Sequence, residues 1–168
     1  MEDRFSLWQI RPYQPQDWPA VWGMLGPVFR AGETYVYGPQ TTEAEAQQIW
    51  VERPQVTLVA LAPDQGLVGT YYLRPNQAEL GSHVANCGYV VSTAARGQGV
   101  GTAMAEHSQQ LARDLGFRAM QFNLVVATNE AAVRLWQRLG FQVVGRLPGA
   151  FRHSRYGFVD ALVFYKPL

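Results

Sequence analysis

The sequence predicts an α/β fold in which a mixed β-sheet is layered with helices. Two observations carry this prediction. Short runs rich in β-branched and aromatic residues recur along the chain, and in the second half two such runs are each followed by an amphipathic stretch of helical length. The 168 residues hold no internal repeat, low-complexity tract or linker, so we expect one domain over residues 1–168.

The first two predicted elements are a short strand and a helix. Phe5–Arg11 has the pattern of a strand. Asp17 begins a helix with Pro19 in its first turn, where the missing N–H is tolerated, and apolar residues follow at helical spacing. Gly26-Pro27 is expected to interrupt this helix, because proline removes an N–H and its ring clashes with the preceding turn.

A second helix and a hairpin follow. Thr42 and Glu45 have the spacing of a capping box, in which each side chain accepts from the other residue's backbone N–H, and they predict a helix start. Val56–Ala62 and Leu67–Leu73 flank the turn sequence Pro63-Asp64-Gln65-Gly66. This arrangement predicts a β-hairpin.

The second half alternates strands with helices. Gly116 and Gly140 are placed to end two helices, and Asn129 is placed to cap the second of them. A long polar and aromatic loop is expected between the last two strands. The expected elements are a strand at 83–91, a helix at 99–115, a strand at 119–126, a helix at 129–139, and strands at 141–144 and 159–165.

Composition narrows the classes of function. A formal net charge of +1 gives no electrostatic basis for binding nucleic acid or an acidic membrane surface. Cys87 is the only cysteine, which excludes an internal disulfide and a multi-thiolate metal site and is typical of a reducing compartment. The first residues lack the apolar run of a signal peptide, and no segment approaches a membrane span. We therefore expect a soluble, cytoplasmic protein without a bound metal.

A glycine-punctuated basic segment, Arg96–Thr102, joins the strand ending at Val91 to the helix that follows. Helix N-termini present unpaired N–H groups and a partial positive charge, and glycines let an anion approach the backbone. The junction therefore predicts a phosphate site. Its spacing is neither the G-x-G-x-x-G of a dinucleotide site nor the Gly-Lys-Ser/Thr of a Walker loop.

Two motifs resemble the signatures of the GNAT superfamily of N-acetyltransferases. Arg96-x-x-Gly99-x-Gly101 resembles its acyl-CoA signature, and Asn129–Phe141 resembles its second signature, an Asn-x-x-Ala helix that ends in Gly-Phe. The resemblance implies the GNAT fold, an α/β (α+β) architecture with a mixed central sheet of about six to seven strands flanked by about four helices. It also implies a V-shaped splay between the strands at 84–91 and 119–126.

The same resemblance implies acetyl-CoA as co-substrate. Strand backbone groups would bond the pantetheine arm, the glycine segment would hold the pyrophosphate, and the asparagine at the start of the last helix would contact the same cofactor. The implied cofactor-binding residues are Tyr89, Val90, Val91, Arg96, Gly97, Gln98, Gly99, Val100, Gly101, Thr102 and Asn129.

One position departs from the family pattern. Many members carry a tyrosine general acid where this sequence has Trp136. An indole N–H does not serve as an acid, so we expect Trp136 to pack, and water or another hydroxyl to protonate the leaving thiolate. With a thiol pKa of about 8.5, the thiolate is a fair leaving group even without a dedicated acid.

Two strand residues, Asn86 and Asn123, are candidates for catalysis. Asparagine is depleted in strand interiors, and its amide is costly to bury without a partner. Because the two strands are expected to diverge, both amides are predicted to point into the cleft and to orient an amine, a water or an oxyanion. The alternative is that each amide satisfies a bulge or a neighbouring backbone group.

Cys87 follows Asn86 on the same strand, so its side chain faces the opposite side of the sheet and is expected in the core. His83 is expected at the surface.

The overall pattern resembles the small-molecule branch of the superfamily, most nearly the fungal enzyme that acetylates azetidine-2-carboxylate and more distantly the phosphinothricin-type enzymes. This implies an amino acid or an analogue as acceptor, with its carboxylate near backbone amides at Asn76 and Leu124. The loop carrying Glu33 and Tyr35 would enclose it, although Glu33 is equally interpreted as an exposed loop carboxylate. The alternatives are a peptide or protein N-acetyltransferase and a non-catalytic acyl-CoA sensor. A homodimer is a further expectation.

Overall fold

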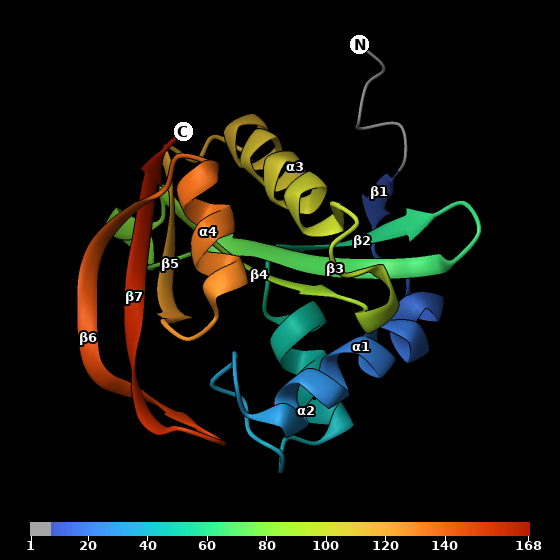
Figure 1. The fold of residues 1–168 in the computed structure, drawn as a ribbon. Helices are drawn as coiled ribbons and strands as arrows, with labels where there is room; N and C mark the ends of the chain where they lie inside the picture. Colours follow the sequence, from blue (N-terminus) through green and yellow to red (C-terminus); the bar gives the residue numbers. More distant parts are fainter. Residues whose placement is uncertain (1–7) are drawn as a thin grey trace.

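The computed structural model describes residues 8–168 and shows one seven-stranded sheet between two layers of helices (Figure 1). The strand order is β1-β2-β3-β4-β5-β7-β6. The strands are β1 (Gln9–Pro12), β2 (Val56–Ala62), β3 (Gly66–Pro75), β4 (Val84–Val91), β5 (Ala119–Val126), β6 (Gln142–His153) and β7 (Gly157–Pro167). The α-helices in this part of the chain are α1 (Trp18–Ala31), α2 (Glu43–Gln47), α3 (Val100–Asp114) and α4 (Glu130–Arg138). The predicted mixed sheet with about four flanking helices is confirmed.

One strand pair differs from all the others. Every neighbouring pair in the sheet is antiparallel except β4 and β5, which run parallel. Their pairing is limited to Val84 with Ala119 and Ala85 with Met120, after which the strands separate. The predicted splay is therefore present. It divides the sheet into a half built from β1 to β4 and a half built from β5, β7 and β6 (Figure 1).

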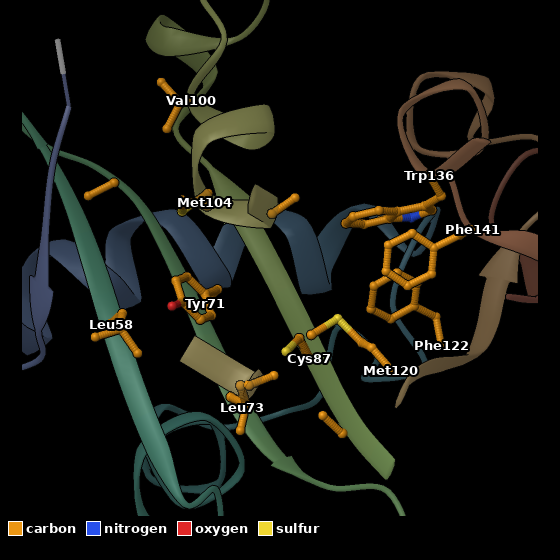
Figure 2. Close-up of a cluster of buried hydrophobic side chains, with 14 of the residues drawn as sticks. Leu58, Tyr71, Leu73, Cys87, Val100, Met104, Met120, Phe122, Trp136 and Phe141 are labelled. Carbon is orange, nitrogen blue, oxygen red and sulfur yellow. The ribbon is translucent and has the colours of Figure 1, made fainter. Parts of the chain in front are cut away.

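Strand alternation gives each face of the sheet its own core. Leu73 and Cys87 lie in the cluster that contains Val100 and Met104 of α3 (Figure 2). The neighbouring residues on the same two strands point the other way, because successive strand side chains face opposite sides. Accordingly, the cluster on the second face contains Tyr72 and Val90 of the sheet with buried residues of α1 and of the segment after α2.

The helix α1 continues past Gly26-Pro27 to Ala31, so the predicted interruption is wrong. The residue before a proline is normally kept out of the helical region by a clash between its Cβ and the proline ring. Gly26 has no Cβ, which removes this clash. Burial of Leu25 and Phe29 on either side of the proline then holds the helix together against the sheet.

The last two strands are longer than predicted, and the expected polar and aromatic loop is largely a hairpin. β6 and β7 pair from Gln142–Tyr165 to His153–Gly157, with register shifts between Val143 and Gly145 and between Leu147 and Phe151. These bulges accommodate glycine and proline residues that the sequence pattern assigns to a loop. The Asp160 carboxylate supports the second bulge by accepting from Arg146 Nε at 2.6 Å and from the Gly149 backbone N–H at 3.0 Å.

Other local predictions are confirmed. Thr42 and Glu45 form the capping box, with the Thr42 N–H donating to Glu45 Oε2 at 2.8 Å, and α2 follows directly. The hairpin of β2 and β3 turns through 63–65, with Gly66 at a positive φ of 69°. The first strand is described from Gln9, and the predicted start at Phe5 lies outside the described residues.

A buried hydroxyl joins three elements beneath α1. Thr70 Oγ1 donates to the Leu58 carbonyl at 2.9 Å and accepts from Trp50 Nε1 at 3.1 Å.

The substitution Thr70→Val keeps the shape of the side chain but leaves the buried indole N–H of Trp50 without an acceptor. We expect the free energy of unfolding to fall by about 1–3 kcal/mol, measured by urea denaturation. Thr128→Val, at an exposed turn, is the control and is expected to change it by less than about 0.5 kcal/mol. Equal effects of the two substitutions would contradict this account.

Candidate active site

The splay between β4 and β5 opens a cavity of about 1030 Å³. Its walls come from α1 and the loop after it, from β3, β4 and β5, and from the start of α4. This is the size of a site for a large ligand, and clefts of this kind are the usual location of small-molecule sites. The predicted cofactor residues that line it are Tyr89, Val90, Val91, Arg96 and Asn129, whereas residues 97–102 lie outside its lining. The predicted catalytic and acceptor residues that line it are Glu33, Tyr35, Asn86, Asn123 and Leu124.

Backbone groups of β4 face this cavity at alternate positions. The Tyr35 hydroxyl accepts from the Tyr89 N–H at 2.7 Å and donates to the Tyr89 carbonyl at 2.9 Å. Both groups of Tyr89 therefore point away from β3. Since backbone direction alternates along an antiparallel strand, the N–H and C=O of Val91 face the same way, whereas those of Val90 point toward β3 opposite Thr70.

Tyr35 is held in place by a layer of aromatic rings. Its ring makes edge contacts with Phe29 and Trp50, at centroid distances of 6.0 and 5.7 Å, and stacks on Tyr37 at 6.4 Å. Burial raises the pKa of Tyr35 well above its ordinary value, so its hydroxyl stays protonated. Tyr35 belongs to the loop after α1, which the sequence predicts to enclose the acceptor. Its neutral hydroxyl lies against the open backbone edge of β4.

The glycine segment forms a turn at the entrance to α3. Gly97 and Gly99 have φ values of 75° and 93°, in the left-handed region that favours glycine. A Cβ at either position would meet nothing within 4 Å, so the backbone conformation, and not a lack of space, requires glycine there. Gly99 is the N-cap of α3, and within residues 8–168 no side chain caps this helix end. The first N–H groups of α3 are therefore free to bind an anion.

Other predicted cofactor residues fix this turn to its surroundings. Gln98 Nε2 donates to the Ala94 carbonyl at 2.9 Å, and Arg138 of α4 donates to Thr102 Oγ1 at 3.1 Å. Gly101 packs against Val91, Val100 is buried, and Arg96 is exposed and lines the cavity. Asn129 Oδ1 accepts from the Ala132 N–H at 3.3 Å and so caps α4, as predicted, and Asn129 also lines the cavity.

A chain of polar side chains occupies the opposite wall. Asn86 is buried, and its amide donates to the Gln121 carbonyl at 3.0 Å just where β5 leaves β4. Arg74 Nε donates to Asn86 Oδ1 at 3.4 Å. Exposed Asn123 accepts from Gln121 Nε2 at 3.0 Å and donates to Asn76 Oδ1 at 2.7 Å.

The structure brings Asn86, Asn123 and Asn76 together as part of this network, although Asn76 lies outside the cavity lining. Leu124 lines the cavity beside Asn123, within a register shift of β5. Sequence reasoning misses Arg74 and Gln121. The available signal for Gln121 is its place two residues before Asn123, on the same strand face, whereas Arg74 meets Asn86 only through the register of β3 with β4.

The predicted acceptor loop closes onto the tip of the last hairpin. Glu33 forms an ion pair with Arg155, whose Nε lies 2.7 Å from Glu33 Oε1, and the Gly32 carbonyl accepts from the Ser154 N–H at 3.0 Å. These contacts tie the segment after α1 to the turn between β6 and β7, and Glu33 and His153, which flank this tie, both line the cavity.

Comparison with known proteins agrees with this arrangement. Residues 18–141 match the family model described as the acetyltransferase (GNAT) family. The chain belongs to the GNAT acetyltransferase family. N-acetyltransferase aca1 of Schizosaccharomyces pombe is 33% identical over 149 residues, covering 79% of this chain and 71% of that protein. These matches establish the protein as an acyltransferase.

Solved structures share the fold. A GCN5-related N-acetyltransferase from Kribbella flavida has a TM-score of 0.92 and 42% sequence identity, covering 97% of this chain and 99% of that chain. A GNAT superfamily phosphinothricin acetyltransferase from Sinorhizobium meliloti, in complex with AcCoA, has a TM-score of 0.82 and 21% identity, covering 96% of this chain and 89% of that chain. The second likeness shows the GNAT fold alone.

Trp136, for which the sequence predicts packing and not acid catalysis, lies in a cluster of tilted and edge-on aromatic rings (Figure 2). It is 7% exposed, and its ring centroid lies 4.3 Å from that of Phe122, 5.1 Å from that of Tyr89 and 5.6 Å from that of Phe141. The structure therefore gives this residue the packing role that its chemistry predicts.

Two further expectations concern absent chemistry. Among residues 8–168 no group of three or more His, Cys, Asp and Glu side chains is placed to hold a metal ion. No helix in the same range is long and apolar enough to cross a membrane. His83 is exposed at the start of β4, as predicted.

Cys87 is predicted to be chemically inert in the folded protein. The thiol is 6% exposed, and burial raises its pKa to about 12, so the reactive thiolate is scarce near neutral pH. Since it is the only cysteine, maleimide labelling at pH 8 reports on this thiol alone. We expect labelling of the folded protein to be at least about 100-fold slower than labelling in urea, because it requires opening of the core. Rapid labelling without urea would show that the thiol is accessible.

Proposed function

We propose that this GNAT enzyme transfers the acetyl group of acetyl-CoA directly to the amine of a small molecule, an amino acid or an amino-acid analogue. One observation carries the proposal. A single cavity joins the open backbone edge of β4, which suits a pantetheine, to a wall of amide and guanidinium groups that suits a polar acceptor, and Arg96 at its margin leads to the glycine turn before α3, which suits a pyrophosphate.

At the cofactor end, the pantetheine arm would bond the β4 edge as an added strand does. The geometry favours Tyr89 and Val91 for the backbone contacts, while Val90 would contribute its side chain to the cavity wall. Pantetheine amides would have to replace the Tyr35 hydroxyl on the Tyr89 N–H and C=O. The segment from Arg96 to Thr102 would hold the pyrophosphate, and Asn129 would contact the cofactor from the start of α4.

The reaction forms a C–N bond, breaks the C–S bond and moves one proton from nitrogen to sulfur. The neutral amine attacks the thioester carbonyl carbon, the resulting oxyanion collapses, the C–S bond breaks, and the extra proton on the attacking nitrogen passes through solvent to the leaving thiolate. Backbone N–H groups at the open edge of β4 would stabilise the oxyanion. Trp136 supplies no acid, and a thiol pKa of about 8.5 makes a dedicated acid dispensable.

At the acceptor end, Asn123 is the stronger candidate for contact with the amine. Its amide is exposed, lies in a β-bulge beside the cavity and bonds only to the side-chain amides of Gln121 and Asn76. The Asn86 amide, in contrast, is buried and donates to the backbone carbonyl of Gln121. Asn86 would therefore assist catalysis by holding β5 at the point of divergence. Glu33 and Tyr35 would enclose the acceptor from the loop after α1, and Leu124 would line its pocket.

The tie between the segment after α1 and the β6–β7 turn favours a small acceptor over a peptide. An extended peptide needs an open groove, and the contacts of Glu33 with Arg155 and of Gly32 with Ser154 join two segments that each line the cavity. The name of the relative aca1 supports N-acetylation, and the AcCoA complex of a structure with this fold supports the cofactor. The homodimer and the cytoplasmic location stay predictions.

The proposal is tested by measuring thiol release from acetyl-CoA with free amino acids, amino-acid analogues and peptides as acceptors. We expect turnover with small amino acids and little with peptides. Turnover with peptides alone would replace the small-molecule assignment by a peptide N-acetyltransferase. Tight binding of acetyl-CoA by calorimetry with no turnover on any acceptor would indicate an acyl-CoA sensor.

Two substitutions should separate the cofactor and acceptor ends. Gly99→Val strains the left-handed residue at the start of α3, so we expect acetyl-CoA binding to weaken by at least about 100-fold in calorimetry. Asn123→Ala should leave the dissociation constant of acetyl-CoA within about threefold and lower kcat by about 10- to 100-fold. Loss of acetyl-CoA binding in the Asn123 variant would show that this residue lies at the cofactor end of the cavity and not at the acceptor end.

The control for the glycine substitution is Gly66→Val. Gly66 also has a positive φ, 69°, and open space at the Cβ position, but lies in the β2–β3 turn. We expect this variant to lose stability to a similar degree while keeping its affinity for acetyl-CoA. Equal losses of affinity would show that the Gly99 effect arises from unfolding.

A further inference from the structure

Arg74 is a cation on the acceptor wall without an ion-pair partner in the described part of the chain. It lies near the end of β3, is half-buried and lines the cavity. Glu33 is the one acidic residue among the described lining residues, and its carboxylate is paired with Arg155. The wall therefore carries positive charge that the protein does not neutralise.

The guanidinium is held in a defined position. Its Cζ lies 5.4 Å from the centroid of the Tyr72 ring, and its Nε donates to Asn86 Oδ1 at 3.4 Å. The Tyr72 ring in turn lies directly over Gly88, where a Cβ would come within 2.6 Å of Cε1. Packing on an aromatic face and one hydrogen bond orient the group, while its two terminal nitrogens form the fork that matches a carboxylate.

Arg74 faces the side of the sheet away from the phosphate cradle. Its strand neighbour Leu73 packs with α3, so Arg74 and Tyr72 point toward α1. An anion at Arg74 is therefore part of the acceptor and not the pyrophosphate at the start of α3.

The sequence also predicts that the backbone N–H of Asn76 contacts the acceptor carboxylate, but this N–H already has a partner in the sheet. The Asn76 N–H donates to the Val84 carbonyl at 2.7 Å. This N–H is thus already used in extending the β3–β4 pairing. Arg74 carries a full positive charge and a fork of donors, so it suits an anion better than the neutral backbone N–H of Leu124, which also lines the cavity.

We infer that Arg74 binds the carboxylate of the acceptor and thereby selects amines that carry an adjacent carboxylate. This inference rests on the proposed function and deepens it. The bidentate pair fixes the acceptor by its acid group, and the amine then lies beside Asn123 for attack on the thioester. An acceptor without the carboxylate leaves the guanidinium without its anion and binds more weakly.

The test compares matched acceptors in wild type, Arg74→Gln, Arg74→Lys and the control Arg53→Gln, which changes an exposed arginine outside the cavity lining. The acceptors are L-azetidine-2-carboxylate, its primary amide, and a dipeptide with this residue at its N-terminus. Thiol release at saturating acetyl-CoA gives kcat and KM, and calorimetry gives the dissociation constant of acetyl-CoA for each variant.

We expect wild type and Arg53→Gln to prefer the acid over its amide by about 30- to 100-fold in kcat/KM, the size of a lost charge-assisted bidentate contact. Arg74→Gln should abolish this preference by raising KM for the acid alone. Arg74→Lys, which keeps the charge but not the fork, should retain part of it. Acetyl-CoA affinity should stay unchanged in all four proteins.

Three outcomes would overturn the inference. The first is an equal kcat/KM of wild type for the acid and for its amide. The second is an equal decrease of kcat/KM for both acceptors in Arg74→Gln. Either result would show that Arg74 does not bind the carboxylate, although the protein would still be an acetyltransferase. The third is a preference for the dipeptide, which would show that Arg74 binds another part of a peptide acceptor and not a carboxylate adjacent to the amine. Failure of wild type to bind acetyl-CoA would instead overturn the proposed function itself, and the calorimetric readout distinguishes that result from the others.

Discussion

The limited pairing of β4 with β5 is the constraint on which the rest of the structure depends. Two residue pairs hold the parallel strands together, and beyond Ala85 each strand must satisfy its inner edge by other means. A buried backbone group without a partner costs about 1–3 kcal/mol, so such an edge needs either protein side chains or a ligand. The Tyr35 hydroxyl supplies both partners for Tyr89, and the Asn86 amide supplies one for the Gln121 carbonyl. These two contacts make the opening compatible with a stable sheet, and the Tyr35 hydroxyl is the group that a ligand bonding to Tyr89 would have to replace.

Strand alternation then separates two kinds of chemistry across one sheet. Residues of β3 and β4 that face α3 are apolar or buried, and the cofactor cradle lies at the end of that helix. The alternate residues of these strands face α1. Beyond the apolar cluster on that face, the next residues are Arg74 of β3 and Asn86 of β4. A donor and an acceptor can therefore approach the gap between β4 and β5 from different faces, which is the geometry that a direct transfer between two substrates needs.

Local signals in this chain predict local structure well. The capping box at Thr42, the cap at Asn129 and the glycine turn at Gly99 depend on contacts within four residues, and the structure confirms each of them. The predicted interruption at Pro27 is wrong because Gly26 has no Cβ to clash with the proline ring, and because burial of Leu25 and Phe29 stabilises the helix against the costs that proline still imposes. The hairpin of β6 and β7 is missed for a similar reason, since bulges admit residues that a strand pattern excludes.

The sequence alone determined the fold class, the order of the elements and the position of the glycine turn before α3, because these follow from periodicity, capping and one contiguous glycine segment. It also placed asparagines on the two strands that diverge. Only the tertiary structure decided what each polar group contacts: that Tyr35 occupies the edge of Tyr89, that Asn86 bonds to β5, and that Arg74 is left with a free fork beside it. Such contacts join residues from 12 to 54 positions apart, and their existence depends on strand register and loop packing, which no short segment of the chain encodes.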